Sequence, residues 1–257
     1  MLAVDTAQFL CYNYSEVKTM TVNELNAIIS SSKKAVFFGG AGVSTESGIP
    51  DFRSPDGIYM SKQKYPPETM LSHTFFMEHT EDFWDFYRNM LYCPDVKPNA
   101  AHFKLAELEK AGKLTAVVTQ NIDGLHSAAG SKNVYELHGS ALRNYCMKCG
   151  KFYTADEVMS VNGIPECSCG GIIKPDVVLY EEALDDDIVS GALNAISNAD
   201  TLIVAGTSLT VYPAAGFIRY FGGENLILIN RDKTAMDSAF SHIIHGKVGE
   251  IMEKIKL

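Results

Sequence analysis

Apolar residues along this chain gather in short runs, and the stretches between the runs show helical spacing of apolar and polar positions. Four of the runs have the length of a buried strand in a parallel sheet. They are AVFF at 35–38, LTAVVT at 114–119, TLIVAG at 201–206 and LILIN at 226–230. Because helix-like stretches separate the runs, the pattern predicts a doubly wound α/β fold built on a parallel sheet.

Capping signals mark the ends of several predicted helices. Thr21 and Glu24 have capping-box spacing ahead of an apolar series. A helix over 99–111 can be capped by the asparagine at its start, and a helix over 185–199 opens with three aspartates. A further helix is expected within 75–91, which reads FFMEHTEDFWDFYRNML.

Two insertions interrupt the alternation of strands and helices. The first, from about 53 to 97, is rich in Pro, Tyr and Phe and is predicted to form a loop and a helix. The second, from about 141 to 175, contains four of the six cysteines. The chain is therefore predicted to have one main domain that carries smaller modules.

Charge and composition exclude some classes of function. The 257 residues carry a formal charge of -9, which argues against general binding of a nucleic-acid backbone. The chain contains no run of about 18 consecutive apolar residues, so the sequence predicts no membrane span. The first twenty residues lack the basic start and apolar centre of a secretory signal, so we expect a cytoplasmic protein.

The clustered cysteines are the most specific local signal. CMKC supplies Cys146 and Cys149, and CSC supplies Cys167 and Cys169. Four sulfurs at this spacing can close a tetrahedral zinc site that has no open position, so the predicted site is structural. The alternative is a set of buried free cysteines.

A glycine-rich turn follows the first predicted strand. Gly40 and Gly42 could bring backbone N–H groups close to a pyrophosphate at the start of a predicted helix. The fingerprint of hydride-transfer enzymes, G-x-G-x-x-G, requires a third glycine where this chain has Thr45. The segment is therefore either a tight turn alone or a dinucleotide site unlike that of a simple dehydrogenase.

Polar residues follow two further strand-like runs. In TQNIDGLH, Gln120, Asn121 and Asp123 lie at the carboxyl end of a predicted parallel strand, where ligands bind in such sheets. In YELHGS, His138 would reach the same crevice if the strand ends converge, and a histidine can remove a proton near neutral pH. The alternatives are an Asx-turn at Asp123 and a structural, hydrogen-bonded His138.

The segment GTSLTVYP at 206–213 repeats the arrangement of strand, glycine and hydroxyl residues. Thr207 and Ser208 could bind phosphate or ribose oxygens, and Asn230 closes the next strand in a position to reach a second ribose. Each of these residues could instead be a cap.

The motifs GAGVSTESGIPDFR, TQNIDGLH, ELHGS, the CxxC and CxC pairs, KPDVVLYEE, GTSLTVYP and LILINR occur in this order. Their combination resembles the sirtuin family of NAD-dependent protein-lysine deacylases, of the bacterial type, from about residue 21 to the C-terminus. The resemblance implies a Rossmann-like large domain with a parallel sheet, a smaller zinc ribbon and a helical module. It divides the chain into an extension over 1–19, a core over 20–52, 98–140 and 176–257, a helical module with a cofactor loop over 53–97 and a zinc module over 141–175.

The resemblance also implies a reaction. Sirtuins cleave nicotinamide from NAD, and the acyl oxygen of a modified lysine attacks the exposed ribose carbon, which yields O-acetyl-ADP-ribose and free lysine. By this analogy Asn121, Ile122 and Asp123 hold the nicotinamide carboxamide, and His138 is the general base that takes a proton from a ribose hydroxyl. The full set that the resemblance assigns to NAD is Ala41, Gly42, Thr45, Phe52, Arg53, Gln120, Ile122, Asp123, His138, Gly206, Thr207, Ser208, Asn230 and Val248.

The acyl-lysine substrate is expected along KPDVVLYEE. Val178, Leu179 and Tyr180 would contact it, and the substrate peptide would pair as an added strand. Glu181 departs from the family pattern, because many members have glycine there. Members that prefer acidic acyl groups carry a Tyr-x-x-Arg pair, and the aligned positions here are Phe86 and Asn89. We therefore expect deacetylation of acetyl-lysine proteins, with no direct nucleic-acid or membrane partner.

Two other functions remain open from the sequence. The same cleavage of NAD could transfer ADP-ribose to a protein, or the enzyme could remove other neutral acyl groups. A non-catalytic NAD-sensing module would require a broken catalytic set, whereas Asn121, Asp123 and His138 are all present.

Overall fold

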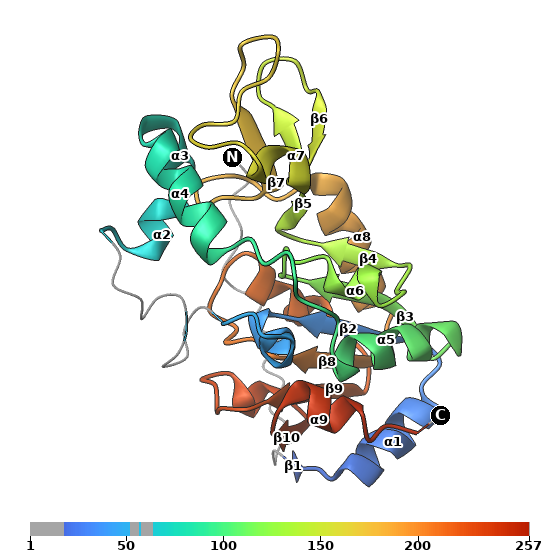
Figure 1. The fold of residues 1–257 in the computed structure, drawn as a ribbon. Helices are drawn as coiled ribbons and strands as arrows, with labels where there is room; N and C mark the ends of the chain where they lie inside the picture. The colour runs from blue at the N-terminus through green and yellow to red at the C-terminus, as the bar shows by residue number, and fades with distance from the viewer. Residues whose placement is uncertain (1–17, 52–56, 58–63, 257) are drawn as a thin grey trace.

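The computed structural model describes residues 18–51, 57 and 64–256, which form two β-sheets with helices around them (Figure 1). The larger sheet has seven parallel strands, and the smaller sheet has three antiparallel strands. The strands of the larger sheet are β1 (Lys18–Thr19), β2 (Ala35–Gly39), β3 (Leu114–Thr119), β4 (Val134–Glu136), β8 (Thr201–Ala205), β9 (Asn225–Asn230) and β10 (His242–His245). Those of the smaller sheet are β5 (Gly139–Cys146), β6 (Phe152–Thr154) and β7 (Ile173–Val177).

The strand order of the larger sheet is that of a Rossmann-like fold. The strands lie in the order β1-β10-β9-β8-β2-β3-β4, so the first strand after β1 is central and the chain winds outward from it in both directions. Strand order reverses between β2 and β8, and ligands of open α/β sheets bind outside the carboxyl ends of the strands at such a point. Residues 18–19, which the sequence placed in an N-terminal extension, add an edge strand beside β10.

The predicted apolar runs form the central strands. All five residues of β2 are buried, because helices cover both faces of the sheet. Phe37 faces α1 (Val22–Ser31), α5 (Ala100–Lys110) and α9 (Val248–Met252) in one apolar cluster. Val36 and Phe38 face α8 (Asp186–Ser197) and the 3-10 helix η4 (Ala214–Tyr220) in another. Side chains of a strand alternate between its two faces, so one short run supplies both cores.

The three helices for which the sequence shows capping signals occur where they were predicted. Thr21 caps α1 in a capping box with Glu24, and Asn99 and Asp185 cap α5 and α8. The α-helices are α1 (Val22–Ser31), α2 (Pro67–Met70), α3 (His73–Glu78), α4 (Thr80–Met90), α5 (Ala100–Lys110), α6 (Leu125–Ala128), α7 (Ala155–Met159), α8 (Asp186–Ser197) and α9 (Val248–Met252).

The single helix expected within 75–91 is instead two helices. The chain leaves helical geometry at His79, where φ is −131° and ψ is 47°, so α3 ends and α4 begins there. The His79 ring packs on Phe75 with centroids 4.9 Å apart, and the Thr80 hydroxyl donates to the Phe76 carbonyl at 2.7 Å. The Thr80 hydroxyl thus bonds a carbonyl oxygen near the C-terminus of α3, and the ring contact stabilises the change of direction at His79.

The two insertions share one apolar core beside the larger sheet (Figure 1). Phe76, Phe83 and Trp84 of α3 and α4 belong to the same buried cluster as Ile173 and Val177 of β7. The helices and the small sheet therefore stabilise each other. Among the described residues, no helix is long and apolar enough to cross a membrane.

Candidate active site

Two turns pack against each other where β2 and β8 end. The backbone N–H of Gly42 donates to the carbonyl oxygen of Gly206 at 2.8 Å. Gly206 has a φ of +59°, and a Cβ built there would lie 2.5 Å from the backbone nitrogen of Val43. A Cβ on Gly42 would lie 2.8 Å from the Gly206 Cα. These glycines are thus required by the contact between the two turns themselves.

The helix predicted after the glycine turn is instead a pair of 3-10 turns, η1 (Ala41–Val43) and η2 (Thr45–Ser47). Ser44 joins them with a φ of −95° and a ψ of 0°, and Gly48 ends the second turn in a left-handed conformation. The Thr45 hydroxyl donates to the Gly42 carbonyl at 3.0 Å. The Thr45 side chain, which stands where the fingerprint has its third glycine, therefore stabilises the turn.

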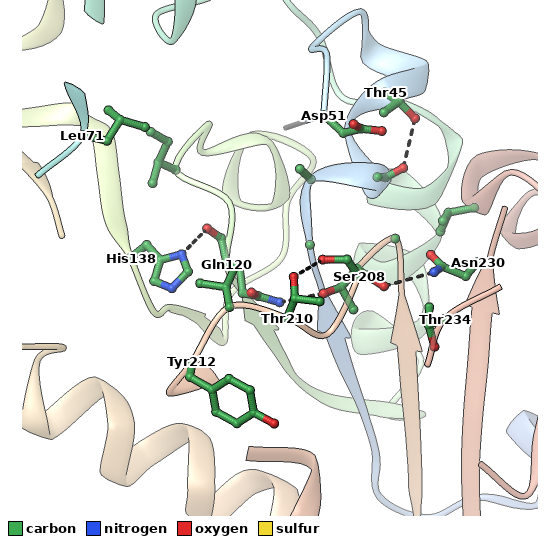
Figure 2. A pocket seen from close by; sticks show the side chains of 18 of the residues that line it. Thr45, Asp51, Leu71, Gln120, His138, Ser208, Thr210, Tyr212, Asn230 and Thr234 are labelled. Atoms are coloured by element: carbon green, nitrogen blue, oxygen red, sulfur yellow. Dashed lines mark hydrogen bonds between the residues drawn. The ribbon is translucent and has the colours of Figure 1, made fainter. Parts of the chain in front are cut away.

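A cavity of 890 Å³ opens at these turns (Figure 2). Leu71 and His138 lie at one end of it, and Asn230 and Thr234 lie at the other. Phe52 and Arg53, which the resemblance assigned to NAD, lie outside the described residues. The sequence-predicted residues that line the cavity are Ala41, Gly42, Thr45, Gln120, Ile122, His138, Val178, Leu179, Tyr180, Gly206, Thr207, Ser208, Asn230 and Val248.

Side-chain amides organise the turn after β8. The Gln120 amide donates to the Thr207 hydroxyl at 3.2 Å, and the Asn230 amide donates to the Thr207 carbonyl at 3.0 Å. The hydroxyls of Ser208 and Thr210 are hydrogen-bonded at 2.8 Å (Figure 2). Three strand ends therefore fix one polar wall. The same Thr207 hydroxyl accepts from the backbone N–H of Leu209 at 3.2 Å within a turn, and the next helix, η4 (Ala214–Tyr220), begins later with Pro213 at its N-cap, so Thr207 is not a helix cap.

His138 presents a free imidazole nitrogen to the cavity. Its Nδ1 lies 2.9 Å from the carbonyl oxygen of Gln120 (Figure 2). Because a carbonyl oxygen only accepts, Nδ1 carries the proton and Nε2 has its lone pair available. Burial lowers the pKa of His138 below its ordinary value of 6.5, and the bond to Gln120 offsets part of this effect. The imidazole is therefore neutral at neutral pH and able to accept a proton.

A second, smaller cavity of 60 Å³ is lined by Asn121, Ile122 and Asp123. Ala41 and Ile122 line both cavities, so the two adjoin. The Asp123 carboxylate accepts from the Leu125 N–H at 2.9 Å, which is the Asx-turn that the sequence left open. The other oxygen of the Asp123 carboxylate accepts a hydrogen bond from a different residue, so the side chain does more than close the turn.

That partner is Ser44, which the sequence reasoning missed. The buried Ser44 hydroxyl donates to Asp123 at 2.6 Å and accepts from the Asn121 amide at 3.0 Å. The sequence signal that could have identified Ser44 is its hydroxyl group within a glycine-rich turn. The larger cavity also includes Tyr212, which lies within the predicted GTSLTVYP segment, and Leu71 from the first insertion, whose position depends on the tertiary fold.

The four clustered cysteines fit a structural zinc ion. Their sulfur atoms all lie within 4.8 Å of one another, with 3.5 Å between Cys146 and Cys169 and 3.7 Å between Cys149 and Cys167. A tetrahedron with Zn–S bonds of about 2.3 Å requires sulfur separations of about 3.8 Å. Because all four corners are sulfur, the metal would have no position for a reacting water.

Comparisons with known proteins agree with this geometry. A profile of the Sir2 family matches residues 40–213. An NAD-dependent protein deacetylase from Clostridium acetobutylicum is 61% identical over 238 residues, which cover 91% of this chain and 97% of the relative.

Solved structures show the same similarity. A Sir2 homologue in complex with NAD superposes with a TM-score of 0.84 at 36% identity, covering 93% of this chain and 94% of that chain. A Sir2 variant with a deacetylated p53 peptide and 3'-O-acetyl ADP-ribose gives a TM-score of 0.83 at 39% identity, covering 91% and 96%. Extensive identity over nearly the whole chain accompanies the shared fold, and the chain belongs to the Sir2 family.

Proposed function

We propose that this protein is an NAD-dependent protein-lysine deacetylase that converts acetyl-lysine, NAD and water to lysine, nicotinamide and O-acetyl-ADP-ribose. The observation that carries the proposal is His138, whose unprotonated Nε2 faces the same cavity as the turns after β2 and β8. The name of the clostridial relative and the ligands of the solved Sir2 complexes support the same activity.

The described residues suit a dinucleotide along the cavity. We assign the adenosine half to the polar wall of Gly206, Thr207, Ser208 and Asn230, together with Val248. Ala41, Gly42, Thr45 and Gln120 would line the middle, as expected from the resemblance, and Phe52 and Arg53 remain predictions.

The smaller cavity is assigned to nicotinamide. Asn121 and Asp123 can bond a carboxamide, which is both donor and acceptor, and Ile122 supplies an apolar contact. Ser44 holds the two polar side chains in place. Bound NAD supplies a ribose carbon that becomes electrophilic as its neutral nicotinamide leaves, so the pocket needs polar positioning and shielding from water more than a strong acid.

His138 then acts as the general base. Its protonated Nδ1 is held by Gln120, which fixes the ring and leaves Nε2 to take a proton from a ribose hydroxyl. The deprotonated oxygen could then attack the acyl carbon, the lysine nitrogen would leave with a proton, and a water molecule would supply the oxygen that completes O-acetyl-ADP-ribose. No side-chain nucleophile is required by this scheme.

The acyl group is expected to be neutral. Val178, Leu179 and Tyr180 line the cavity, and Leu71 adds an apolar side chain at the His138 end. Phe86 and Asn89, which stand where other members carry a carboxylate-binding pair, offer no cation, and Phe86 is buried in the apolar core of the insertions. This composition favours acetyl over succinyl groups.

The test is an assay with an acetyl-lysine peptide and NAD that follows nicotinamide and O-acetyl-ADP-ribose. The wild type should form both in equal amounts, and His138→Tyr should form neither at a comparable rate. Equal release of acetyl groups by the two proteins would refute the assignment of His138. Labelled ADP-ribose that remains on protein would instead support the second candidate, an ADP-ribosyltransferase.

The domain boundaries, the absence of nucleic-acid and membrane partners and a cytoplasmic location remain predictions from the sequence. We propose that residues 141–175 form a structural zinc module, since all four cysteine sulfurs of that segment converge.

A further inference from the structure

Glu181 has an unusual backbone conformation at the edge of the cavity. Its φ is +77°, and among the described residues other than glycine only Leu209 shares a positive φ. Side chains disfavour this region, and such a conformation persists where surrounding contacts enforce it. Many family members have glycine at this position, whereas this chain has a side chain there and must hold it in place.

The contact that holds Glu181 comes from the first insertion. One oxygen of its carboxylate accepts from both the backbone N–H and the hydroxyl of Thr74, at 2.9 and 2.7 Å. The Thr74 hydroxyl and backbone N–H lower the pKa of Glu181, so the contact is charged at neutral pH. Charge-assisted bonds of this kind are stronger than neutral ones.

Tyr180, which precedes Glu181, attaches residues 180–182 to the start of α3. The Tyr180 N–H donates to the Leu71 carbonyl at 2.9 Å, and the Tyr180 carbonyl accepts from the His73 N–H at 3.0 Å. Leu71 marks this end of the cavity in Figure 2. Glu182 adds a bond to the His73 side chain at 2.8 Å. The segment is thus attached along its outer edge to the start of α3.

Tyr180 and Glu181 are the two central residues of a turn, which the Glu182 N–H closes by donating to the Leu179 carbonyl at 3.0 Å. The second central residue of a type II turn has a positive φ, as Glu181 has, and from this position Glu181 lines the cavity. Its backbone N–H and carbonyl form no backbone–backbone hydrogen bond with another described residue. These two groups are therefore available to a peptide that adds as a strand.

We propose that the Glu181–Thr74 contact positions the substrate peptide by holding the Glu181 backbone in the left-handed conformation that directs its N–H and carbonyl into the cavity. The role depends on the proposed function, because a peptide substrate is what would pair with this edge. A purely structural role would be to stabilise α3 alone.

Substitutions at Glu181 separate the two roles. Glu181→Gly removes the contact but also relieves the positive φ, so its Tm should stay within about 3 °C of wild type. Glu181→Ala removes the contact and keeps the strain, so its Tm should fall further. Glu181→Gln keeps an oxygen that can accept both bonds and should rescue binding.

The chain offers a matched control in Glu24. Its carboxylate accepts from the backbone N–H and the hydroxyl of Thr21, at 2.6 and 2.8 Å, far from the cavity. Glu24→Ala therefore removes the same pair of bonds at a helix start without touching the site.

The measurement is the Kd of a fluorescent acetyl-lysine peptide by anisotropy without NAD, with the KM values for peptide and NAD alongside. Both Glu181→Gly and Glu181→Ala should weaken peptide binding about tenfold, because the Glu181 backbone would no longer be held by Thr74. The KM for NAD should stay within twofold, and Glu24→Ala should bind peptide like wild type.

A peptide Kd for Glu181→Gly within twofold of wild type would overturn the proposal, as would equal weakening in Glu24→Ala. A wild type that binds no acetylated peptide would overturn it too. Binding without nicotinamide release would refute the proposed function alone, because the effect of Glu181 would still appear in the Kd.

Discussion

Replacing Gly206 by alanine should disrupt the contact between the two turns that form the cavity. The left-handed conformation of Gly206 costs a residue with a side chain about 1–2 kcal/mol. The added Cβ would meet the Val43 backbone nitrogen at 2.5 Å, and overpacking of this kind costs about 1–3 kcal/mol more. The expected loss in the free energy of unfolding is therefore about 2–5 kcal/mol, or about 4–20 °C in Tm.

Gly112 provides the control for the conformational part of this cost. It has a φ of +72°, close to that of Gly206, but a Cβ there would meet nothing within 4 Å. Gly112→Ala should lose about 1–2 kcal/mol and keep the KM for NAD, whereas Gly206→Ala should lose more and raise that KM. Urea unfolding measures the first quantity, and initial rates of nicotinamide release measure the second.

The difference between the two variants isolates the steric cost. If Gly206→Ala were no less stable than Gly112→Ala, the turns would have room for a side chain, and close packing would not explain the glycine. An unchanged KM for NAD in a destabilised Gly206→Ala protein would separate the turn contact from cofactor binding.

Three further predictions follow from the site. The value of kcat/KM should fall as pH drops through the pKa of His138, because the base acts unprotonated, and the midpoint should lie below pH 6.5, because burial lowers that pKa. A midpoint above pH 6.5 would contradict this assignment. Ser44→Ala should lower the free energy of unfolding by about 1–3 kcal/mol and slow nicotinamide release at least tenfold, because it leaves the buried Asn121 amide without its partner. A rate of nicotinamide release within twofold of wild type would show that Asn121 and Asp123 keep their positions without Ser44. Cys167→Ser should reduce bound zinc, measured by mass spectrometry, from about one ion per chain to near zero and lower the Tm, and a metal-free, fully stable wild type would refute the zinc site.

The four inner strands β2, β3, β8 and β9 and the cysteine cluster were predictable because their signals are local. A run such as TLIVAG is apolar enough to be buried on both faces, and CxxC and CxC pairs bring sulfurs together by spacing alone. The convergence of His138 with Gln120 was also accessible, because both follow strand-like runs of one expected sheet.

Other features depend on contacts between distant segments. The break at His79 is stabilised by aromatic packing with Phe75, which a helical pattern through 75–91 conceals. The 3-10 turns after β2 result from docking against Gly206, more than 160 positions later. Glu181 could be recognised as a departure from the family pattern, but its partner Thr74 lies in a different insertion.

The apolar core shared by the two insertions is separate from the two clusters that cover the larger sheet, so we expect these two parts of the molecule to open independently. Phe83 and Ile173 are distant in sequence but belong to one buried cluster, which also contains Leu71 and Leu179 beside the proposed peptide edge. Amide protons of α4 and β7 should therefore exchange with solvent in a common opening, separately from those of β2 and β8. Loss of zinc from the four cysteines should then loosen the surface proposed to bind the peptide, while the part proposed to bind the dinucleotide stays folded.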